Sequence, residues 1–319
     1  MSLLEVGKLD GQLADCITVY CMAGLKGRGK VDFQDVTGSF WRFNYRKDPL
    51  IFFSIGLFRS PIERNELLKK YFDIDLSVVT TDISTYHDHI MESLQLKDLP
   101  MVFIDRYDMP HDEICYQKFH ESHYILIQGY DALSDEYHIV DFFTTPSFNR
   151  VKKSLLEKSI QNAYHADHPM IIGKLNTINH TFDKSAMNTL IQSNLSHILQ
   201  QEDPSSGLLG VKSLYQDIDQ RDDYLTDYIK VLNLFSKLKH VGLYREQHSK
   251  FIGKHFDHQE LSKLFIDLNI KWQLTANYLL KAHLTKKDKL IEYSLETIQE
   301  IIQVKKEIIP LYENLIKGV

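Results

Sequence analysis

Three residues in the first half of the chain are of the types that together perform nucleophilic catalysis: Cys16, His123 and Asp141. A cysteine thiolate attacks acyl carbons, an imidazole accepts and returns the thiol proton, and a carboxylate fixes the tautomer of the imidazole. Cys16 lies where a helix is predicted to begin, and the N–H groups and dipole of a helix start favour the thiolate. The sequence therefore offers a candidate nucleophile, base and orienting acid.

The proposed base and acid lie on two runs, 122–130 and 136–141, that predict a β-hairpin. Both runs are rich in β-branched and aromatic residues, and turn-forming residues separate them. Pairing residue 130 with residue 135 places Tyr124 opposite Asp141 and turns His123 to the other face. A one-residue shift or a bulge instead puts His123 opposite Asp141 with both side chains on one face. The candidate pair therefore depends on the register of the hairpin.

Other residues are candidates for holding a substrate. Backbone N–H groups at the helix start, together with Gln12, could stabilise the oxyanion of a tetrahedral intermediate. Tyr107, His111 and His120 follow the predicted strand 100–105 and are candidate substrate-binding residues. No Cys and His cluster has the spacing of a zinc site, so we expect no metal.

The remaining pattern predicts an α+β protein with two domains. Residues 1–150 mix helices with a mainly antiparallel sheet, and residues 151–319 are mainly helical. Helices are predicted at 15–27, 61–71, 82–96, 154–163, 184–200, 211–219, 222–235, 242–255, 259–282 and 288–316. Strands are predicted at 50–58, 75–81, 100–105 and 168–175 in addition to the hairpin.

Composition narrows the classes of protein to which the chain can belong. Its 319 residues are 43% hydrophobic and 25% charged, as is ordinary for a globular protein. A formal net charge of −6 argues against nucleic acid as the main partner. Three cysteines without framework spacing, no signal peptide and no apolar run of membrane-spanning length together predict a cytoplasmic protein that does not bind a membrane.

Several segments carry a resemblance to a known family. Pro100-Met-Val-Phe-Ile-Asp-Arg-Tyr-Asp-Met-Pro110, His120-Glu-Ser-His-Tyr-Ile-Leu-Ile-Gln-Gly-Tyr-Asp131 and His138-Ile-Val-Asp141 closely resemble the butirosin biosynthesis protein H family. So does a cysteine near the N-terminus that leads a short helix ending in glycine. Two segments of the helical region, 206–214 and 242–252, also look like recurring segments of that family.

The resemblance implies a papain-like cysteine fold, related to bacteriocin-leader peptidases, in residues 1–150. It also implies acyl transfer from a carrier-protein thioester to an amine of a small natural product, with Cys16 as nucleophile, His123 as base and Asp141 as its orienter. The donor would be an acyl group on phosphopantetheine, the partner an acyl or peptidyl carrier protein, and no cofactor would be bound. Two alternatives stay open: a cysteine peptidase or amidase, and a non-catalytic protein that binds a small molecule or a carrier.

Overall fold

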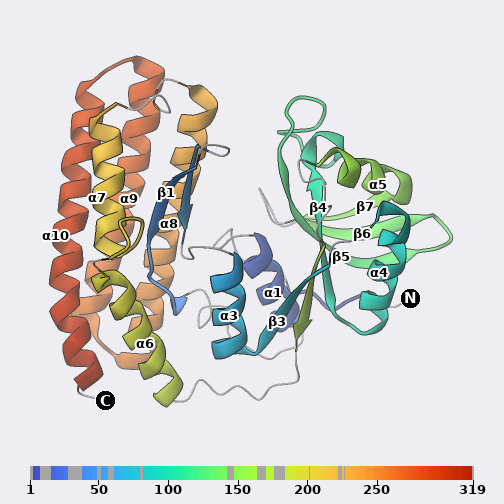
Figure 1. The fold of residues 1–319 in the computed structure, drawn as a ribbon, viewed down its shortest axis with the longest axis horizontal. Helices are drawn as coiled ribbons and strands as arrows, with labels where there is room; N and C mark the ends of the chain where they lie inside the picture. Colours follow the sequence, from blue (N-terminus) through green and yellow to red (C-terminus); the bar gives the residue numbers. More distant parts are fainter. Residues whose placement is uncertain are drawn as a thin grey trace. The chain divides into compact units, whose positions relative to one another are not determined.

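The structure is a computed structural model. It describes residues 3–7, 16–27, 38–48, 52–56, 61–79, 82–141, 147–163, 170–175, 184–200, 202–221, 225 and 227–317. The chain divides into two compact units: a sheet unit, residues 1–33 and 65–180, and a helical unit, residues 34–64 and 181–319 (Figure 1). The mixed α+β class is confirmed, with an antiparallel sheet in the first unit and helices in the second.

This division differs from the sequence-based boundary between residues 150 and 151. Helix α5 and strand β8 follow that boundary but pack on the sheet, so they belong to the sheet unit. Residues 34–64 precede the sheet strands in the chain but belong to the helical unit. Neither unit is therefore one continuous segment.

The sheet unit is built around six strands in the order β3-β8-β4-β5-β6-β7, and every neighbouring pair is antiparallel. The strands are β3 (Ile74–Val79), β4 (Leu99–Asp105), β5 (Ser122–Asp131), β6 (Glu136–Asp141), β7 (Ser147–Lys152) and β8 (Met170–Leu175). Its helical elements are α1 (Cys16–Gly27), α4 (Ile83–Gln95), η1 (Arg106–Asp108) and α5 (Lys153–Asn162), while α3 (Pro61–Phe72) straddles the division between the units.

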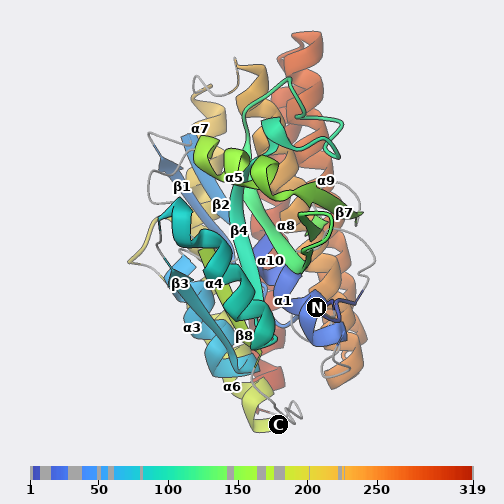
Figure 2. The ribbon, with the colours of Figure 1, turned by 90° about the vertical axis from the view of Figure 1, so that its right-hand side faces the viewer.

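Helices cover both faces of this sheet. Helix α1 packs against β4, β5 and β8, and α4 and α5 lie on the opposite face (Figures 1 and 2). Residues 17–25 of α1 are all buried, so this helix is enclosed rather than amphipathic. Local signals set the ends of other helices as predicted: α3 begins at Pro61, and the Asp82 carboxylate caps α4 by accepting from the Ser84 N–H at 2.9 Å.

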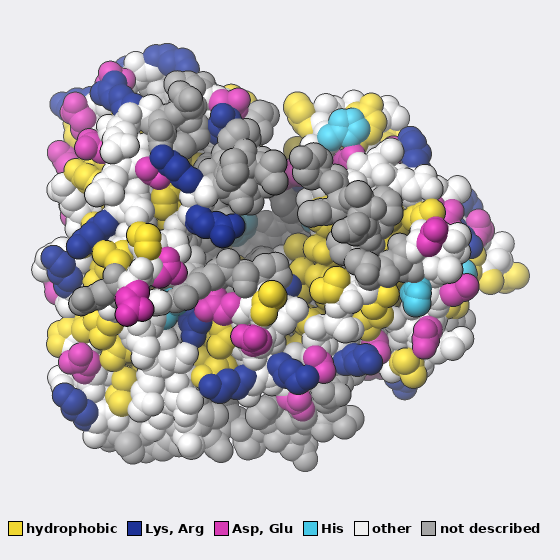
Figure 3. All heavy atoms as spheres, in the orientation of Figure 1, with side chains coloured by type: hydrophobic (Ala, Val, Ile, Leu, Met, Phe, Trp, Pro, Cys, Tyr) yellow, Lys and Arg dark blue, Asp and Glu magenta, His cyan; other side chains and the backbone are white. Residues whose placement is uncertain are grey.

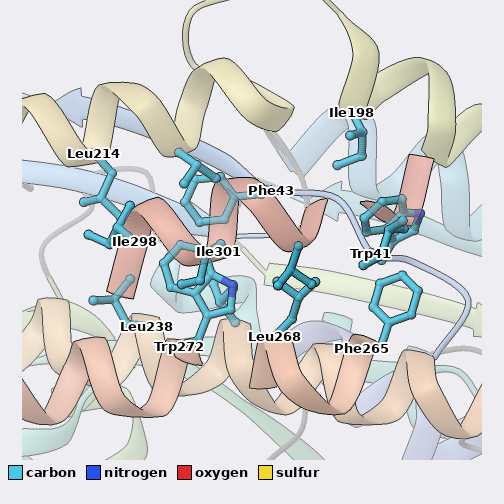
Figure 4. Close-up of a cluster of buried hydrophobic side chains, with 14 of the residues drawn as sticks. Trp41, Phe43, Ile198, Leu214, Leu238, Phe265, Leu268, Trp272, Ile298 and Ile301 are labelled. Atoms are coloured by element: carbon cyan, nitrogen blue, oxygen red, sulfur yellow. The ribbon is translucent and has the colours of Figure 1, made fainter. Parts of the chain in front are cut away.

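The helical unit consists of a two-stranded hairpin and five helices within its described residues. They are β1 (Asn44–Asp48), β2 (Phe52–Gly56), α6 (Lys184–Leu199), α7 (Gly207–Asp219), α8 (Tyr228–Phe256), α9 (Gln259–Thr285) and α10 (Lys289–Lys317). Helix α9 packs against both α8 and α10. Aromatic residues before β1, including Trp41 and Phe43, are fully buried among the helices (Figure 4).

Helix α8 is one continuous helix, so the prediction of two helices separated near Gly242 is wrong. A Cβ at Gly242 would lie 2.8 Å from side-chain atoms of Asn269 and Gln273 on α9. The glycine therefore permits a close approach of two helices and does not end one. Strands β1 and β7 were not predicted either.

None of the helices in the described ranges has the length and apolar character needed to cross a membrane. On the face drawn in Figure 3, Lys and Arg side chains are interspersed with Asp and Glu side chains.

Candidate active site

His123 and Asp141 lie together at one end of the sheet. His123 is the second residue of β5 and pairs with Ile104 of β4, and Asp141 is the last residue of β6. The distance between His123 Nε2 and Asp141 Oδ2 is 3.4 Å. Both side chains are buried, with 8% and 6% of their surface exposed, so the carboxylate interacts with the imidazole in a medium of low dielectric constant.

A bulge in the hairpin brings His123 and Asp141 to one face, as the sequence analysis required. The pairing register of the two strands differs from both registers considered there. Asp131 pairs with Glu136 rather than residue 130 with residue 135, and the register shifts between Ile127 and Gly129. Continued past Leu126–Val140, the pairing sets Asp141 opposite residue 125, not opposite His123. His123 is two residues from that position and therefore shares its face, as a diagonal neighbour of Asp141.

The bulge is held by the N-terminal segment 3–7. Gln128, the extra residue of the bulge, accepts a hydrogen bond at its backbone oxygen from the Leu4 N–H (2.9 Å), and its side-chain amide donates to the Leu4 carbonyl oxygen (2.7 Å). A Cβ at Gly129 would lie 2.5 Å from Leu3 Cδ2, so a larger residue there would displace the Leu3 side chain. Residues remote in sequence therefore determine which face His123 occupies.

A second imidazole contacts the same carboxylate oxygen. His111 Nε2 lies 3.1 Å from Asp141 Oδ2, and 12% of the His111 side chain is exposed. His111 was predicted to bind substrate, and its place beside Asp141 could not be read from its position in a loop. Because a carboxylate only accepts hydrogen bonds, the ring nitrogen of His111 that faces Asp141 carries the hydrogen.

The loop that carries His111 is fixed by a buried arginine. Arg106 in η1 has 1% of its side chain exposed and forms ion pairs with Asp112 and Glu121, which lie near the two ends of the loop. Asp112 Oδ1 also accepts from the N–H groups of Ile114 and Cys115 at 3.0 and 2.9 Å. These charged contacts hold residues 109–121 in one conformation without regular secondary structure.

Cys16 is the first residue of α1, as predicted, and it is the half-buried one of the three cysteines. One helical turn later, the Tyr20 hydroxyl donates to the backbone oxygen of Tyr124 at 2.9 Å. Tyr124 follows His123 in β5, so this bond ties the first turns of α1 to the strand that carries the candidate base. Cys16 and His123 thus belong to two elements joined by a hydrogen bond one helical turn from Cys16 and one residue from His123.

The other two cysteines are poor nucleophiles. Cys21 is fully buried within α1, and Cys115 is 1% exposed in the loop after η1. Burial is the main cause that raises the pKa of the Cys115 thiol to about 12. The Asp112 and Glu121 carboxylates also raise it, and Arg106 lowers it. A thiol of this kind stays protonated at neutral pH and cannot attack an acyl carbon.

Tyr107 and His120 form a separate cluster around Asp105. His120 Nδ1 lies 2.6 Å from Asp105 Oδ2, the Tyr107 N–H donates to Asp105 Oδ1 at 3.0 Å, and the two rings are stacked with centroids 4.2 Å apart. Asp105 pairs with Ser122, one residue before His123, so its side chain leaves the opposite face of the sheet. The structure therefore brings His120 and Tyr107 to Asp105 and not to Asp141.

The geometry defines the state of a neutral His123. Its Nε2 faces the Asp141 carboxylate, which favours the hydrogen on Nε2 and leaves the lone pair on Nδ1. An imidazole in this tautomer can accept a proton at Nδ1. Within the described ranges, no group of three or more His, Cys, Asp or Glu side chains could hold a metal ion. Gln12, the proposed oxyanion residue, lies outside the described residues.

Comparison with known proteins assigns the chain to no family. No protein-family model matches the chain, and no curated protein matches its sequence.

Proposed function

We propose that this protein is a cysteine-dependent acyltransferase of papain-like arrangement. It would move an acyl group from the phosphopantetheine thioester of an acyl or peptidyl carrier protein to the amine of a small molecule in natural-product biosynthesis, in the cytoplasm. The observation that carries the proposal is the buried His123–Asp141 pair on a strand that is bonded to the first turns of the helix led by Cys16. The residues that resemble the butirosin biosynthesis protein H family include both members of that pair.

In the first half of the reaction, the Cys16 thiolate attacks the thioester carbonyl while His123 holds the thiol proton. Backbone N–H groups in the first turn of α1 stabilise the oxyanion. The tetrahedral intermediate collapses by breaking the bond to the phosphopantetheine sulfur, which leaves as a thiol with the proton from His123. The product is an acyl group on Cys16 by a new thioester bond, so this exchange has little free-energy change of its own.

In the second half, the amine attacks the acyl carbon on Cys16. His123, again neutral, accepts the amine proton at Nδ1, and Asp141 stabilises the imidazolium that forms. The Cys16 sulfur leaves as a thiolate and the amide is released. Amide formation makes the whole reaction favourable. Burial of both His123 and Asp141 limits the access of water to the base, which favours an amine over water as the acceptor.

The test is to mix the full chain with a carrier protein that bears an octanoyl-phosphopantetheine group and to measure the intact mass. We expect the mass of one octanoyl group on the wild-type chain and on Cys115→Ala, and no added mass on Cys16→Ala. Addition of ethanolamine should then remove the acyl group from Cys16 and yield the octanoyl amide.

Two results would contradict the proposal. Absence of an adduct together with unhindered alkylation of Cys16 by iodoacetamide in the presence of the acyl carrier would exclude Cys16 as the acceptor of the acyl group. Rapid loss of the adduct in water, with no increase on addition of the amine, would identify a hydrolase.

A further inference from the structure

Two cationic side chains of the helical unit are completely buried, Arg245 on α8 and Lys305 on α10. Both residues have 0% of their surface exposed. Neither forms an ion pair with any carboxylate in the part of the chain that the structure describes. Because an isolated charge is costly to bury, such side chains in folded proteins are normally paired or bound to a ligand.

Their hydrogen-bonding capacity is also mostly unused. Arg245 Nη2 donates to the backbone oxygen of Arg42 at 2.6 Å, but its Nε and Nη1 groups have no acceptor among the described residues. Lys305 Nζ lies 5.2 Å from the centre of the Phe43 ring and likewise has no acceptor there. The ring face gives the ammonium group some stabilisation but accepts no conventional hydrogen bond.

Two further buried donors lie in the same core. The indole N–H groups of Trp41 and Trp272 have no acceptor among the described residues. Trp272 stacks on Phe43 with ring centroids 5.1 Å apart, and Trp41 lies 5.0 Å from Tyr312, a ring that interacts electrostatically with Arg245. Figure 4 shows Trp41, Phe43 and Trp272 within this cluster. One core therefore holds four buried side chains that have hydrogen-bond donors to spare and no matching acceptors.

The two cations also influence each other. Burial lowers the pKa of Arg245 to about 9, and the Tyr312 and Tyr244 side chains oppose this only in part. Burial lowers the pKa of Lys305 well below its ordinary value, and the positive charge of Arg245 lowers it further. The charges are thus close enough to repel, and no carboxylate contributes to either of them.

We propose that Arg245 and Lys305 form an internal phosphate-binding site of the helical unit. A phosphate dianion, inorganic or as a monoester, would neutralise both charges and supply only acceptor oxygens to a set of groups that only donate. A carboxylate would neutralise only one of the two charges. This site is independent of the acyl-transfer chemistry proposed for the sheet unit.

Because both cationic side chains are buried, the anion would be enclosed and would exchange slowly. The first test therefore measures content: the full chain is purified in phosphate buffer, desalted into chloride buffer, denatured in acid, and assayed for inorganic phosphate. We expect close to one phosphate per chain for the wild type. The matched variants are Lys305→Met, which should lose most of the phosphate, and Lys306→Met, which removes the exposed neighbouring lysine and should keep it.

The second test refolds each protein with phosphate, phenyl phosphate, acetate or chloride at equal ionic strength and follows thermal unfolding by tryptophan fluorescence. Both tryptophans of the chain lie in this core, so the signal reports on the helical unit. Phosphate or its monoester should raise the melting temperature of the wild type and Lys306→Met. In Lys305→Met the affinity for phosphate should fall at least about tenfold, because a buried charge-assisted bond is lost.

The two forms of the ligand give distinguishable results: stabilisation by both phosphates indicates room for an ester group, and stabilisation by inorganic phosphate alone indicates the free ion. Absence of phosphate from the wild type together with equal melting temperatures in phosphate and chloride would overturn the proposal. Two other results would also overturn the proposal. One is that phosphate raises the melting temperatures of the wild type and Lys305→Met equally, and the other is that acetate raises the wild-type melting temperature as much as phosphate does. These measurements use the unmodified chain as well, so they remain decisive if a variant fails to fold.

Discussion

The two units of the molecule differ in how their most deeply buried cations are paired. In the sheet unit the buried charged groups at the end of the sheet have partners of opposite charge or hydrogen-bond partners: Arg106 with Asp112 and Glu121, Asp108 with Lys158 and Asn162, and Asp141 with His111 and His123. In the helical unit Arg42 pairs with Glu63, but the fully buried Arg245 and Lys305 have no carboxylate partner among the described residues, and Arg245 donates only to the Arg42 backbone oxygen.

The difference shows what each arrangement can do. Paired charges fix geometry, and in the sheet unit they orient an imidazole and hold the loop that carries a second one. Unpaired buried cations are costly, which is why we propose an anion as the partner of Arg245 and Lys305. The paired charges of the sheet unit thus suit the proposed acyl transfer, and the unpaired cations of the helical unit suit the proposed binding of an anion.

The largest expected effect comes from removing the carboxylate of the candidate site. Asp141→Ala takes away the acceptor that orients His123, so the rate of Cys16 acylation by the octanoyl carrier should fall about 100-fold or more. Asp141→Asn should lose less, because its amide oxygen can still face Nε2 of His123. Intact-mass time courses give both rates. Equal rates for wild type and Asp141→Ala would show that the pair has no role in the chemistry.

Breaking the paired charges of the loop should be costly to stability. Arg106→Met leaves the buried Asp112 carboxylate without its cation, and the free energy of unfolding should fall by about 3 kcal/mol. Glu121→Gln removes a partner whose side chain is 53% exposed, and it should cost less than about 1 kcal/mol. Hydrogen-exchange mass spectrometry of β4 and β5 measures the loss in the sheet unit. Similar effects of the two substitutions would mean that the buried pair is not the one that holds the loop.

A smaller, pH-dependent effect is expected in the helical unit. His248 is fully buried, and burial lowers its pKa to about 3. Its Nδ1 faces the Gly38 carbonyl oxygen, which can only accept, so Nδ1 carries the hydrogen and Nε2 accepts from the Tyr312 hydroxyl. The neutral ring is therefore the form that fits, and protonation would break the bond to Tyr312.

The sign of the pH effect follows from this pKa. The unfolded chain, whose His248 has an ordinary pKa near 6.5, binds more protons than the folded chain between about pH 6.5 and pH 3. The neutral His248 thus makes its full contribution to the free energy of unfolding above about pH 6.5. On acidification this contribution falls, by about 1–2 kcal/mol at about pH 5. Urea unfolding followed by tryptophan fluorescence measures it. His248→Gln should flatten this dependence, and an unchanged slope in that variant would assign it to other groups.

Most of the fold could be predicted from local patterns. Helix α1 begins and ends where its sequence indicates, Asp82 caps α4, and the alternation of β5 and β6 marks a hairpin. Errors arose where a distant segment decides the structure. The close packing of α8 on α9 explains Gly242, which otherwise looks like a helix end, and residues 34–64 pack with helices that lie more than a hundred residues later.

The candidate site was predictable in its residue types but not in its full geometry. The alternation of a strand gives two possible faces for His123, and only the bulge at Gln128, held by the Leu4 backbone, selects the one that it shares with Asp141. The place of His111 depends on the folding of an irregular loop around Arg106. The buried cations of the helical unit carried no sequence signal, because a lysine or arginine on a helix is normally at the surface.

The most direct measurement for the central claim is the rate at which iodoacetamide alkylates Cys16 as a function of pH. If His123 and Asp141 activate this thiol, Cys16 should react at about pH 6, where an ordinary cysteine is almost fully protonated, at least about tenfold faster than in His123→Ala. Peptide mass spectrometry resolves the sites, and the buried Cys115 should stay unmodified in both proteins. Identical pH profiles for Cys16 in the wild type and in His123→Ala would contradict the account.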